Sequence, residues 1–347
     1  MQSLYLSVGA ALFGTVVLAL LLRPVARSFD FIDKPGGRKQ HAGEVPIIGG
    51  IAMFVGLSLG LSLLPETARP PAGFTATAFG FVCLGLLDDR LNLPSIFRLL
   101  VQLGAVLLMI FVGGLGVYYV GAPFGAGAVI FEPWVAVIVT SMLVVGAVNA
   151  LNMIDGIDGL AGSMGLLALI AVAGVGLFGG NTPVFSVAVV LAGAVIGFLL
   201  FNLPLGLNER TRIFMGDAGS MLLGFSLAWT MVALSQEPET PVEPVTLLWF
   251  ATIPIFDMVS TAVGRIFRGQ SPMSADNTHL HHWLLKKGLT VRLSLLVLIG
   301  FALIWATVGL FLDLVADVPE WLSLLAFVAA GLVTVAVIQK LPQSRSA

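Results

Sequence analysis

Long apolar segments recur along this chain and restrict its fold more than any other feature. They cover residues 4–22, 47–64, 74–87, 99–112, 134–148, 160–178, 184–203, 221–234, 245–267, 293–312 and 321–338. Most are near the ~20 residues that a helix needs to cross the hydrocarbon core of a bilayer. The 347 residues are 58% hydrophobic and only 10% charged, which no soluble core requires. The sequence therefore predicts an all-α, polytopic membrane protein of about eleven transmembrane helices.

The composition predicts one membrane domain without further modules. The segment at residues 4–22 has no basic residue before it and no clear small-residue cleavage site after it, so we expect a retained helix instead of a signal peptide. Cys83 is the single cysteine, which excludes an internal disulfide. The chain has no basic tract of the kind that binds nucleic acid. We expect a single domain over residues 1–347.

The basic residues indicate how the helices are oriented. With about eleven crossings, alternate loops fall on alternate sides of the membrane. Of the 17 Lys and Arg residues, all except Arg69 then fall on one side. By the positive-inside rule that side is cytoplasmic. The prediction is a periplasmic N-terminus and a cytoplasmic C-terminus, with cytoplasmic loops at about residues 23–46, 88–98, 149–159, 204–220 and 265–292.

Four polar side chains recur every third residue between two apolar segments. They are Asn149, Asn152, Asp155 and Asp158. A spacing of three keeps neighbouring members roughly on one side of a helix, and ionisable groups near membrane depth tend to mark a functional site. The alternative is a polar loop that caps a helix, but one cap needs only one such residue.

Carboxylates lie at the ends of two other apolar segments. Asp88 and Asp89 are adjacent, which suggests metal or proton chemistry; a solvated helix end is the alternative. Asp217 lies between Gly216 and Gly219 at an expected helix start, where backbone N–H groups favour an anion. A phosphate ligand beside Asp217 would need a cation between them, and magnesium fits. A plain helix cap is the other interpretation of Asp217.

Two cytoplasmic loops combine basic residues and histidines. Lys34 lies in the first, where a cation suits a phosphate-bearing ligand. The last contains Arg265 and the sequence His279-x-His281-His282. Zinc would need a suitable ligand set, and no cysteine accompanies these histidines, so a sugar or diphosphate suits them better. Ordinary solvated loops are the alternative for both.

Taken together, these motifs resemble the polyprenyl-phosphate N-acetylhexosamine-1-phosphate transferase family, and most closely its bacterial undecaprenyl-phosphate N-acetylglucosamine-1-phosphate transferase branch. The resemblance covers about residues 33–282 in motif order. It implies transfer of an N-acetylhexosamine-1-phosphate, expected to be GlcNAc-1-phosphate, from a UDP-sugar to undecaprenyl phosphate with release of UMP. It also implies a start of O-antigen or other cell-envelope polysaccharide synthesis, in the bacterial inner membrane with the active site facing the cytoplasm. It leaves a homodimer open.

The resemblance further assigns roles to the acidic and amide residues. Asp217 matches the magnesium-binding aspartate, with manganese as the alternative metal, and Asn152 matches an asparagine near the metal and the diphosphate. Asp88 and Asp89 match a pair tied to the lipid phosphate and to catalysis. Asp155 is expected beside them as a third catalytic residue.

Substrate contacts are expected from the remaining motif residues. Asp158 matches a residue that contacts uracil, and Asn149 is expected to bind substrate near it. The expected contacts to phosphates or to the sugar are Lys34, Arg98, Arg265, His279, His281 and His282.

Two departures and one rival class bear on this assignment. Arg90 stands where the phospho-N-acetylmuramoyl-pentapeptide-type transferases have a third aspartate, and Leu280 interrupts the histidine triplet, so both point away from that alternative branch. Secondary transporters also carry acidic groups at membrane depth, but their sites lie near the midplane and often between repeated halves. Here the motifs cluster on one face and no repeat is visible.

The orientation is testable by labelling. Single cysteines introduced as Gln40→Cys and Thr278→Cys, in a Cys83→Ser background, should not react with a membrane-impermeant maleimide in intact cells because both loops are expected in the cytoplasm. They should react after the cells are permeabilised. Labelling of either position from outside would overturn the topology.

Overall fold

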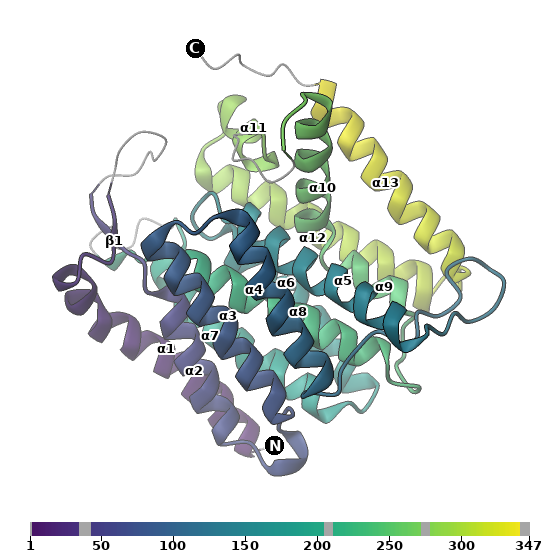
Figure 1. Ribbon diagram of the computed structural model, residues 1–347, viewed down its shortest axis with the longest axis horizontal. Helices are drawn as coiled ribbons and strands as arrows, with labels where there is room; N and C mark the ends of the chain where they lie inside the picture. Colours follow the sequence, from purple (N-terminus) through teal and green to yellow (C-terminus); the bar gives the residue numbers. More distant parts are fainter. Residues whose placement is uncertain (1, 35–42, 205–210, 272–277, 341–347) are drawn as a thin grey trace.

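The protein is described here from a computed structural model that covers residues 2–34, 43–204, 211–271 and 278–340, and long α-helices side by side dominate it (Figure 1). The elements in chain order are α1 (Gln2–Ser28), β1 (Ile32–Asp33), β2 (Val45–Pro46), α2 (Gly49–Ser62), the short 3₁₀ helix η1 (Glu66–Ala68), α3 (Ala72–Leu91), α4 (Ser95–Phe111), α5 (Pro133–Ile154), α6 (Leu160–Phe178), α7 (Thr182–Asn202), α8 (Gly216–Ser235), α9 (Pro244–Trp249), α10 (Thr252–Phe267), α11 (Leu280–Lys286), α12 (Val291–Leu314) and α13 (Glu320–Lys340). Arg38, Lys39, Arg210 and Arg345, which contribute to the charge asymmetry, lie outside the described residues.

The expectation of a helical membrane protein is confirmed. Within the described part of the chain, eight helices are long and apolar enough to cross a membrane, namely α1, α3, α5, α6, α7, α8, α12 and α13. The helices α2 and α4 are apolar but shorter. Each of the eleven apolar segments of the sequence therefore corresponds to a helix or, in one case, to a pair of helices.

That one case is the segment at residues 245–267, which we expected to be a single helix and which divides into α9 and α10. Pro254 explains the break, because proline has no N–H to donate to the carbonyl of Phe250 four residues earlier. The last turn of α9 instead tightens, with the N–H of Ala251 donating to the carbonyl of Leu248 at 3.1 Å. A second difference is α11, which lies within the expected loop at residues 265–292.

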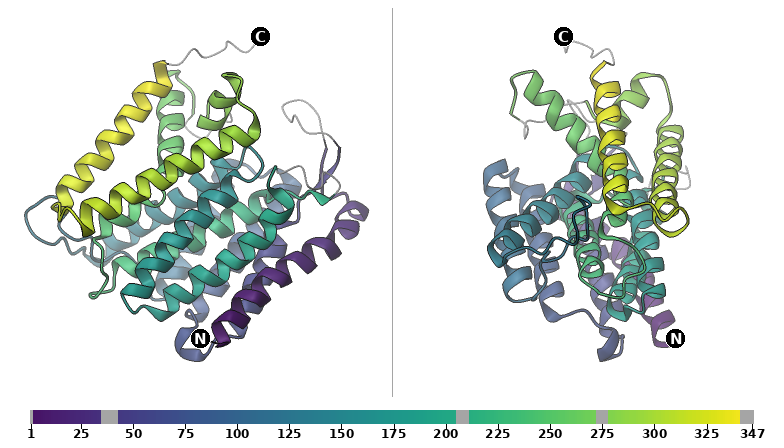
Figure 2. Two further views of the ribbon diagram at one scale, coloured as in Figure 1. Left: turned by 180° about the vertical axis from the view of Figure 1, so that it is seen from behind. Right: turned by 90° about the vertical axis from the view of Figure 1, so that its right-hand side faces the viewer.

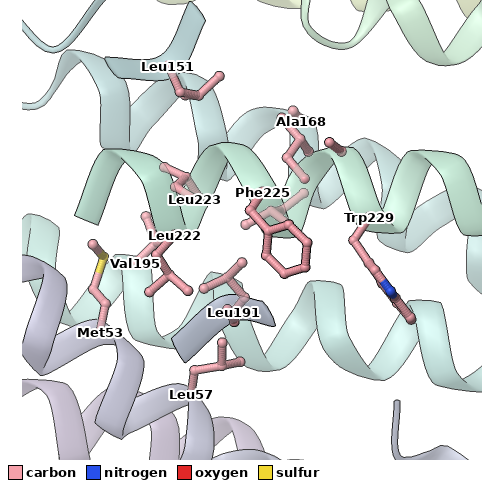
Figure 3. Packing of buried hydrophobic residues seen from close by; sticks show 14 of the residues in the cluster. Met53, Leu57, Leu151, Ala168, Leu191, Val195, Leu222, Leu223, Phe225 and Trp229 are labelled. Atoms are coloured by element: carbon pink, nitrogen blue, oxygen red, sulfur yellow. The ribbon is translucent and has the colours of Figure 1, made fainter. Parts of the chain in front are cut away.

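Helix α8 is the central helix of the bundle, and it packs against α2, α3, α5 and α6. Its side chains are buried on nearly all sides, as expected of a helix that is apolar all round. Figure 3 shows Leu222 of α8 beside Leu191 and Val195 of α7, with Leu57 of α2 close by. Seen from behind in Figure 2, α1 and α7 lie side by side on the outside, and they are in contact.

Two glycines let neighbouring helices approach the first turn of α8. A Cβ atom on Gly50 of α2 would lie 2.7 Å from the carbonyl carbon of Ala218, and one on Gly85 of α3 would lie 2.5 Å from that of Asp217. Real Cβ contacts are not this short, so both positions require glycine if α2 and α3 are to remain where they are. The start of α8 is therefore enclosed by backbone from two sides.

The segment before α8 is also joined to the start of α2 by backbone hydrogen bonds. The N–H of Phe214 donates to the carbonyl of Pro46 at 2.9 Å, and the N–H of Gly50 donates to the carbonyl of Met215 at 3.0 Å. These bonds connect β2 and the first turn of α2 to the segment that leads into Asp217.

A pair of substitutions tests the close packing of α3 on α8. Gly85→Ala should lower the melting temperature in detergent, because overpacking costs about 1–3 kcal/mol. Gly80→Ala is the matched control in the same helix, since a Cβ there meets nothing within 4 Å; it should be neutral or slightly stabilising. Equal melting temperatures for the two variants would contradict the packing.

Candidate active site

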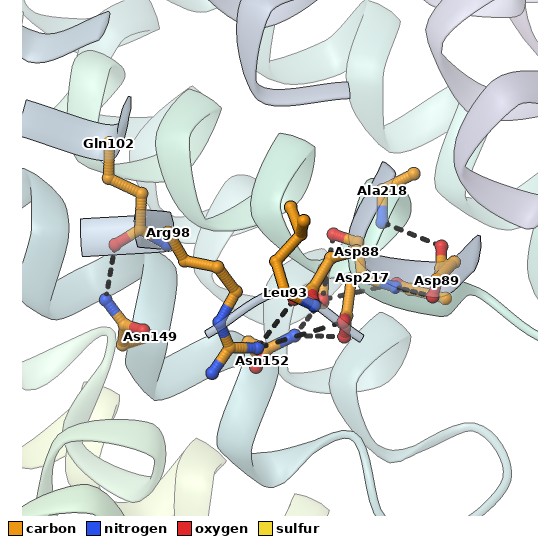
Figure 4. Close-up of polar contacts among 11 residues, drawn as sticks. Asp88, Asp89, Leu93, Arg98, Gln102, Asn149, Asn152, Asp217 and Ala218 are labelled. Carbon is orange, nitrogen blue, oxygen red and sulfur yellow. Dashed lines mark hydrogen bonds and ion pairs between the residues drawn. The ribbon is translucent and has the colours of Figure 1, made fainter. Parts of the chain in front are cut away.

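The polar side chains of the candidate site lie where the helices extend beyond the apolar segments. The apolar segments at residues 74–87 and 134–148 end before the helices that contain them, since α3 runs to Leu91 and α5 to Ile154. As a result Asp88, Arg98, Asn152 and Asp217 meet at one end of the bundle, from α3, α4, α5 and α8 (Figure 4).

Asp88 is 4% exposed and holds Arg98 in place. The Arg98 Nη1 atom donates to Asp88 Oδ2 at 2.6 Å, and the N–H of Leu93 donates to Asp88 Oδ1 at 2.9 Å. The second bond closes the turn between α3 and α4, where Asn92 adopts a left-handed conformation with φ 49°. A buried carboxylate needs such partners, and here both of its oxygens have one.

Asp217 lies near the same guanidinium. The distance from Arg98 Nη1 to Asp217 Oδ2 is 4.0 Å, so both carboxylates approach the same guanidinium nitrogen. The Asn152 Nδ2 atom donates to Asp217 Oδ1 at 2.6 Å and to Ser220 Oγ at 3.0 Å. Asn152 thereby fixes the direction in which the Asp217 carboxylate points.

Asp89 makes different contacts from its neighbour, because adjacent side chains on a helix diverge. Asp89 Oδ1 accepts from the N–H of Asp217 at 2.9 Å, and Asp89 Oδ2 accepts from the N–H of Ala218 at 3.3 Å. These N–H groups have no partner within their own helix, so Asp89 caps α8 from a different helix. The catalytic role that we expected for Asp89 stays a prediction; its contacts position Asp217.

The turn after α5 carries Asp155 and Asp158. Burial raises the pKa of the Asp155 carboxyl to about 7, and the charges of Asp158 and Asp89 add to this. Asp158 forms an ion pair with Arg212. Asn202 holds the end of the turn: its Oδ1 accepts from the N–H of Gly159 at 2.7 Å, and its Nδ2 donates to the carbonyl of Ile213 at 2.9 Å.

The histidine motif lies against this turn. His281 is fully buried, and a Cβ atom on Gly156 would collide with its imidazole ring. Within the described residues neither ring nitrogen of His281 has a hydrogen-bond partner, and burial lowers the pKa of this imidazole well below its ordinary value, with His282 and His279 adding to the effect. The ring of His282 is 4.2 Å from that of His281 between centroids.

Three other expected site residues are Lys34, Asn149 and Arg265. Lys34 forms a 2.6 Å ion pair with Asp30 at the surface, and among the described contacts none joins it to the carboxylates. Asn149 donates to Gln102 Oε1 at 2.9 Å, which ties α5 to α4 one turn before Asn152. Arg265 is buried at the end of α10.

Sequence reasoning missed several polar residues that shape the site. They are Gln102, Asn202, Arg212, Ser220 and Asp257. Asp257, Gln102 and Asn202 each lie inside an apolar segment, so the argument that polar groups at membrane depth are costly would have found them. The sequence around Arg212 and Ser220 gives no such signal, because each residue acts through a contact with a residue far away in the sequence.

The donor atoms fit a hard divalent cation. Asp217 and Asp88 both reach the same atom of Arg98, and carboxylate oxygens are the ligands that magnesium prefers. Within the described part of the chain, no three or more His, Cys, Asp and Glu side chains form a metal-binding group. Magnesium is usually held by one or two carboxylates and by oxygens of a phosphorylated substrate, so a pair of carboxylates is an adequate protein contribution.

A helical membrane bundle with carboxylates, an arginine and an asparagine gathered at one end is the arrangement expected of a membrane enzyme that acts on a phosphorylated ligand. Comparison with known proteins narrows this class. The model of "Glycosyl transferase family 4" matches residues 71–235, which include Asp88, Asp89, Arg98, Asn152 and Asp217.

Curated relatives match over nearly the whole chain. The chain is 33% identical to the undecaprenyl-phosphate alpha-N-acetylglucosaminyl 1-phosphate transferase of Escherichia coli O157:H7, over 92% of this chain and 86% of that protein. It is 33% identical to the protein of the same name from Pasteurella multocida, over 93% and 90%, and 32% identical to that of Yersinia pestis, over 92% and 87%. The chain belongs to glycosyl transferase family 4.

Proposed function

We propose that this protein transfers N-acetylglucosamine-1-phosphate from UDP-N-acetylglucosamine to undecaprenyl phosphate and releases UMP. The enzyme is a sugar-phosphate transferase, as its family and named relatives indicate. The observation that carries the proposal is the meeting of Asp88, Arg98, Asn152 and Asp217 at one end of a membrane bundle. The product would start a cell-envelope polysaccharide such as O-antigen.

The transfer requires little acid–base chemistry from the protein. An oxygen of the lipid phosphate forms a bond to the β-phosphorus of the donor, and the bond from that phosphorus to the oxygen bridging it to the α-phosphorus breaks. A phosphate monoester has a second pKa of about 6, so the attacking oxygen is largely deprotonated at neutral pH. Positioning and charge neutralisation are then the main tasks of the site.

Charge neutralisation falls to Asp217 and Arg98. We propose that Asp217, with Asp88 and Asn152 beside it, would hold a divalent cation, magnesium or alternatively manganese, whose charge would offset that on the donor diphosphate as UMP leaves. Arg98 can donate to a phosphate oxygen, because its guanidinium carries five N–H groups and Asp88 occupies only part of them. Asp88 would orient Arg98 toward the lipid phosphate.

The remaining expected residues are proposed to bind the donor. Asp158, supported by its ion pair with Arg212, would contact the uracil, while Asp155 and Asp89 would act close to the transfer. The proposed phosphate or sugar contacts are Lys34, Asn149, Arg265, His279, His281 and His282. What supports the histidine assignment is the position of His281 against the turn that carries Asp155 and Asp158.

We further propose eleven crossings, with the N-terminus in the periplasm and the site and the C-terminus in the cytoplasm of a bacterial cell. Two short helices and the broken pair α9 and α10 would complete the eight long ones. The start of α1 and the end of α13 lie at opposite ends of the bundle in both views of Figure 2, as an odd number of crossings requires. A homodimer is compatible with this arrangement.

The test uses purified full-length protein in nanodiscs with undecaprenyl phosphate and magnesium. UMP release is measured with UDP-N-acetylglucosamine, UDP-N-acetylgalactosamine and UDP-N-acetylmuramoyl-pentapeptide in parallel. We expect turnover with the first donor and none with the peptide-bearing one. Absence of UMP release with every donor would refute the proposed activity, and preference for the peptide-bearing donor would move the protein to the alternative branch.

The metal assignment is tested by Asp217→Asn. Turnover should fall by about 100- to 1000-fold, as when one charge-stabilising group is removed from an active site, while the melting temperature changes little because asparagine is isosteric. Asp317→Asn is the matched control, since Asp317 lies in a distant loop at φ 48°, which asparagine tolerates. Wild-type turnover and metal dependence in Asp217→Asn would show that this carboxylate does not hold the metal.

A further inference from the structure

Asp257 is a buried carboxylate that the expected catalytic motifs do not include. It lies near the middle of α10 and is 1% exposed. Burying a charged carboxylate is costly unless it is paired and hydrogen-bonded. Both of its oxygens contact the histidine motif: Oδ2 lies 2.7 Å from His279 Nδ1, and Oδ1 accepts from the N–H of Leu280 at 2.6 Å.

This contact determines which nitrogen of His279 carries the proton. An ionised carboxylate only accepts hydrogen bonds, so His279 Nδ1 is the donor. The hydroxyl oxygen of Thr261, one helical turn beyond Asp257, lies 3.3 Å from the same nitrogen. The Nε2 atom of a neutral imidazole is then left as an acceptor for a ligand. Carboxylates that contact one ring nitrogen in this way set both the tautomer and the orientation of the ring.

The same contact holds the whole histidine motif. His279 precedes the first residue of α11, and its carbonyl accepts from the N–H of Trp283 at 3.1 Å. The rings of His279 and His281 are stacked, with centroids 5.6 Å apart and planes inclined by 8°. His281 in turn lies against Gly156. The hydrogen bond that holds His279 to Asp257 of α10 therefore also determines where His281 packs against Gly156, in the turn after α5.

We propose that Asp257 is a positioning residue for the transfer reaction, which acts through His279 by fixing its tautomer and by holding the histidine motif against the turn at Gly156. The inference rests on the proposed function, because it concerns how that site is assembled. A purely structural role, in which Asp257 only stabilises the fold, makes different predictions for the experiments that follow.

The first experiment compares two aspartate-to-asparagine variants in nanodiscs. Asp257→Asn should lower kcat for UMP release by about 10- to 100-fold, the range typical of losing a group that orients an active-site histidine. Asp313→Asn is the matched control, because Asp313 also accepts two hydrogen bonds, from the N–H of Glu243 at 2.8 Å and from the hydroxyl of Thr246 at 2.6 Å. It should keep the wild-type kcat. Melting temperatures measured for both variants report any loss of stability.

The second experiment is a double-mutant cycle with His279→Ala. If Asp257 acts through His279, Asp257→Asn should have little further effect on kcat once the imidazole is absent. If the fold-losses in kcat of the two single variants multiply in the double variant, Asp257 acts independently of His279 and the proposal is overturned. An unchanged kcat in Asp257→Asn, or an equal fall in Asp313→Asn, would also overturn it.

The third measurement reads the tautomer directly and needs no turnover. The chain contains four histidines, so ¹⁵N-histidine labelling gives a spectrum in which His279 is assigned from its loss in His279→Ala. Wild-type His279 should show a protonated Nδ1 and an unprotonated Nε2, and Asp257→Asn should change this distribution. The same tautomer in both proteins would refute the positioning role. Failure of the wild-type protein to release UMP would instead refute the proposed function.

Discussion

The interaction on which this site depends is the approach of two carboxylates to one guanidinium nitrogen. Carboxylates that approach each other at the margin of an apolar bundle repel, and burial makes the repulsion worse. Arg98 relieves it, with Nη1 2.6 Å from Asp88 and 4.0 Å from Asp217. Asp88 also accepts a hydrogen bond from Leu93 in the turn between α3 and α4. This turn therefore sets where α4 begins and, with it, the position of Arg98.

Most of the helices were predictable, because apolar length alone decides which segments cross a membrane. The segment at residues 160–178 has the bounds of α6, whereas others end short of their helices. The site lies on the polar ends of helices that continue beyond their apolar segments, and hydropathy alone does not predict these ends. The break at Pro254 was visible in the sequence as a proline but was not inferred, since apolar character continues on both sides.

The motif residues were predictable as a group, but their individual contacts were not. Adjacent side chains on a helix diverge, which predicts separate tasks for Asp88 and Asp89, but not that one contacts Arg98 and the other the first N–H groups of α8. That division depends on how α3 packs against α8, and the two helices approach each other closely at Gly85. Asp257 escaped notice because a single acidic residue in an apolar run forms no motif, although its burial made it informative.

The backbone hydrogen bonds between β2 and the segment before α8 have a mechanical consequence. Phe214 is bonded to Pro46, and Met215 to Gly50, on the two sides of the turn that presents Asp217. Strand β2 and the first turn of α2 are thus joined through the backbone to the segment that precedes Asp217. A displacement of β2 would therefore be transmitted through backbone hydrogen bonds to the segment that directly precedes the Asp217 carboxylate.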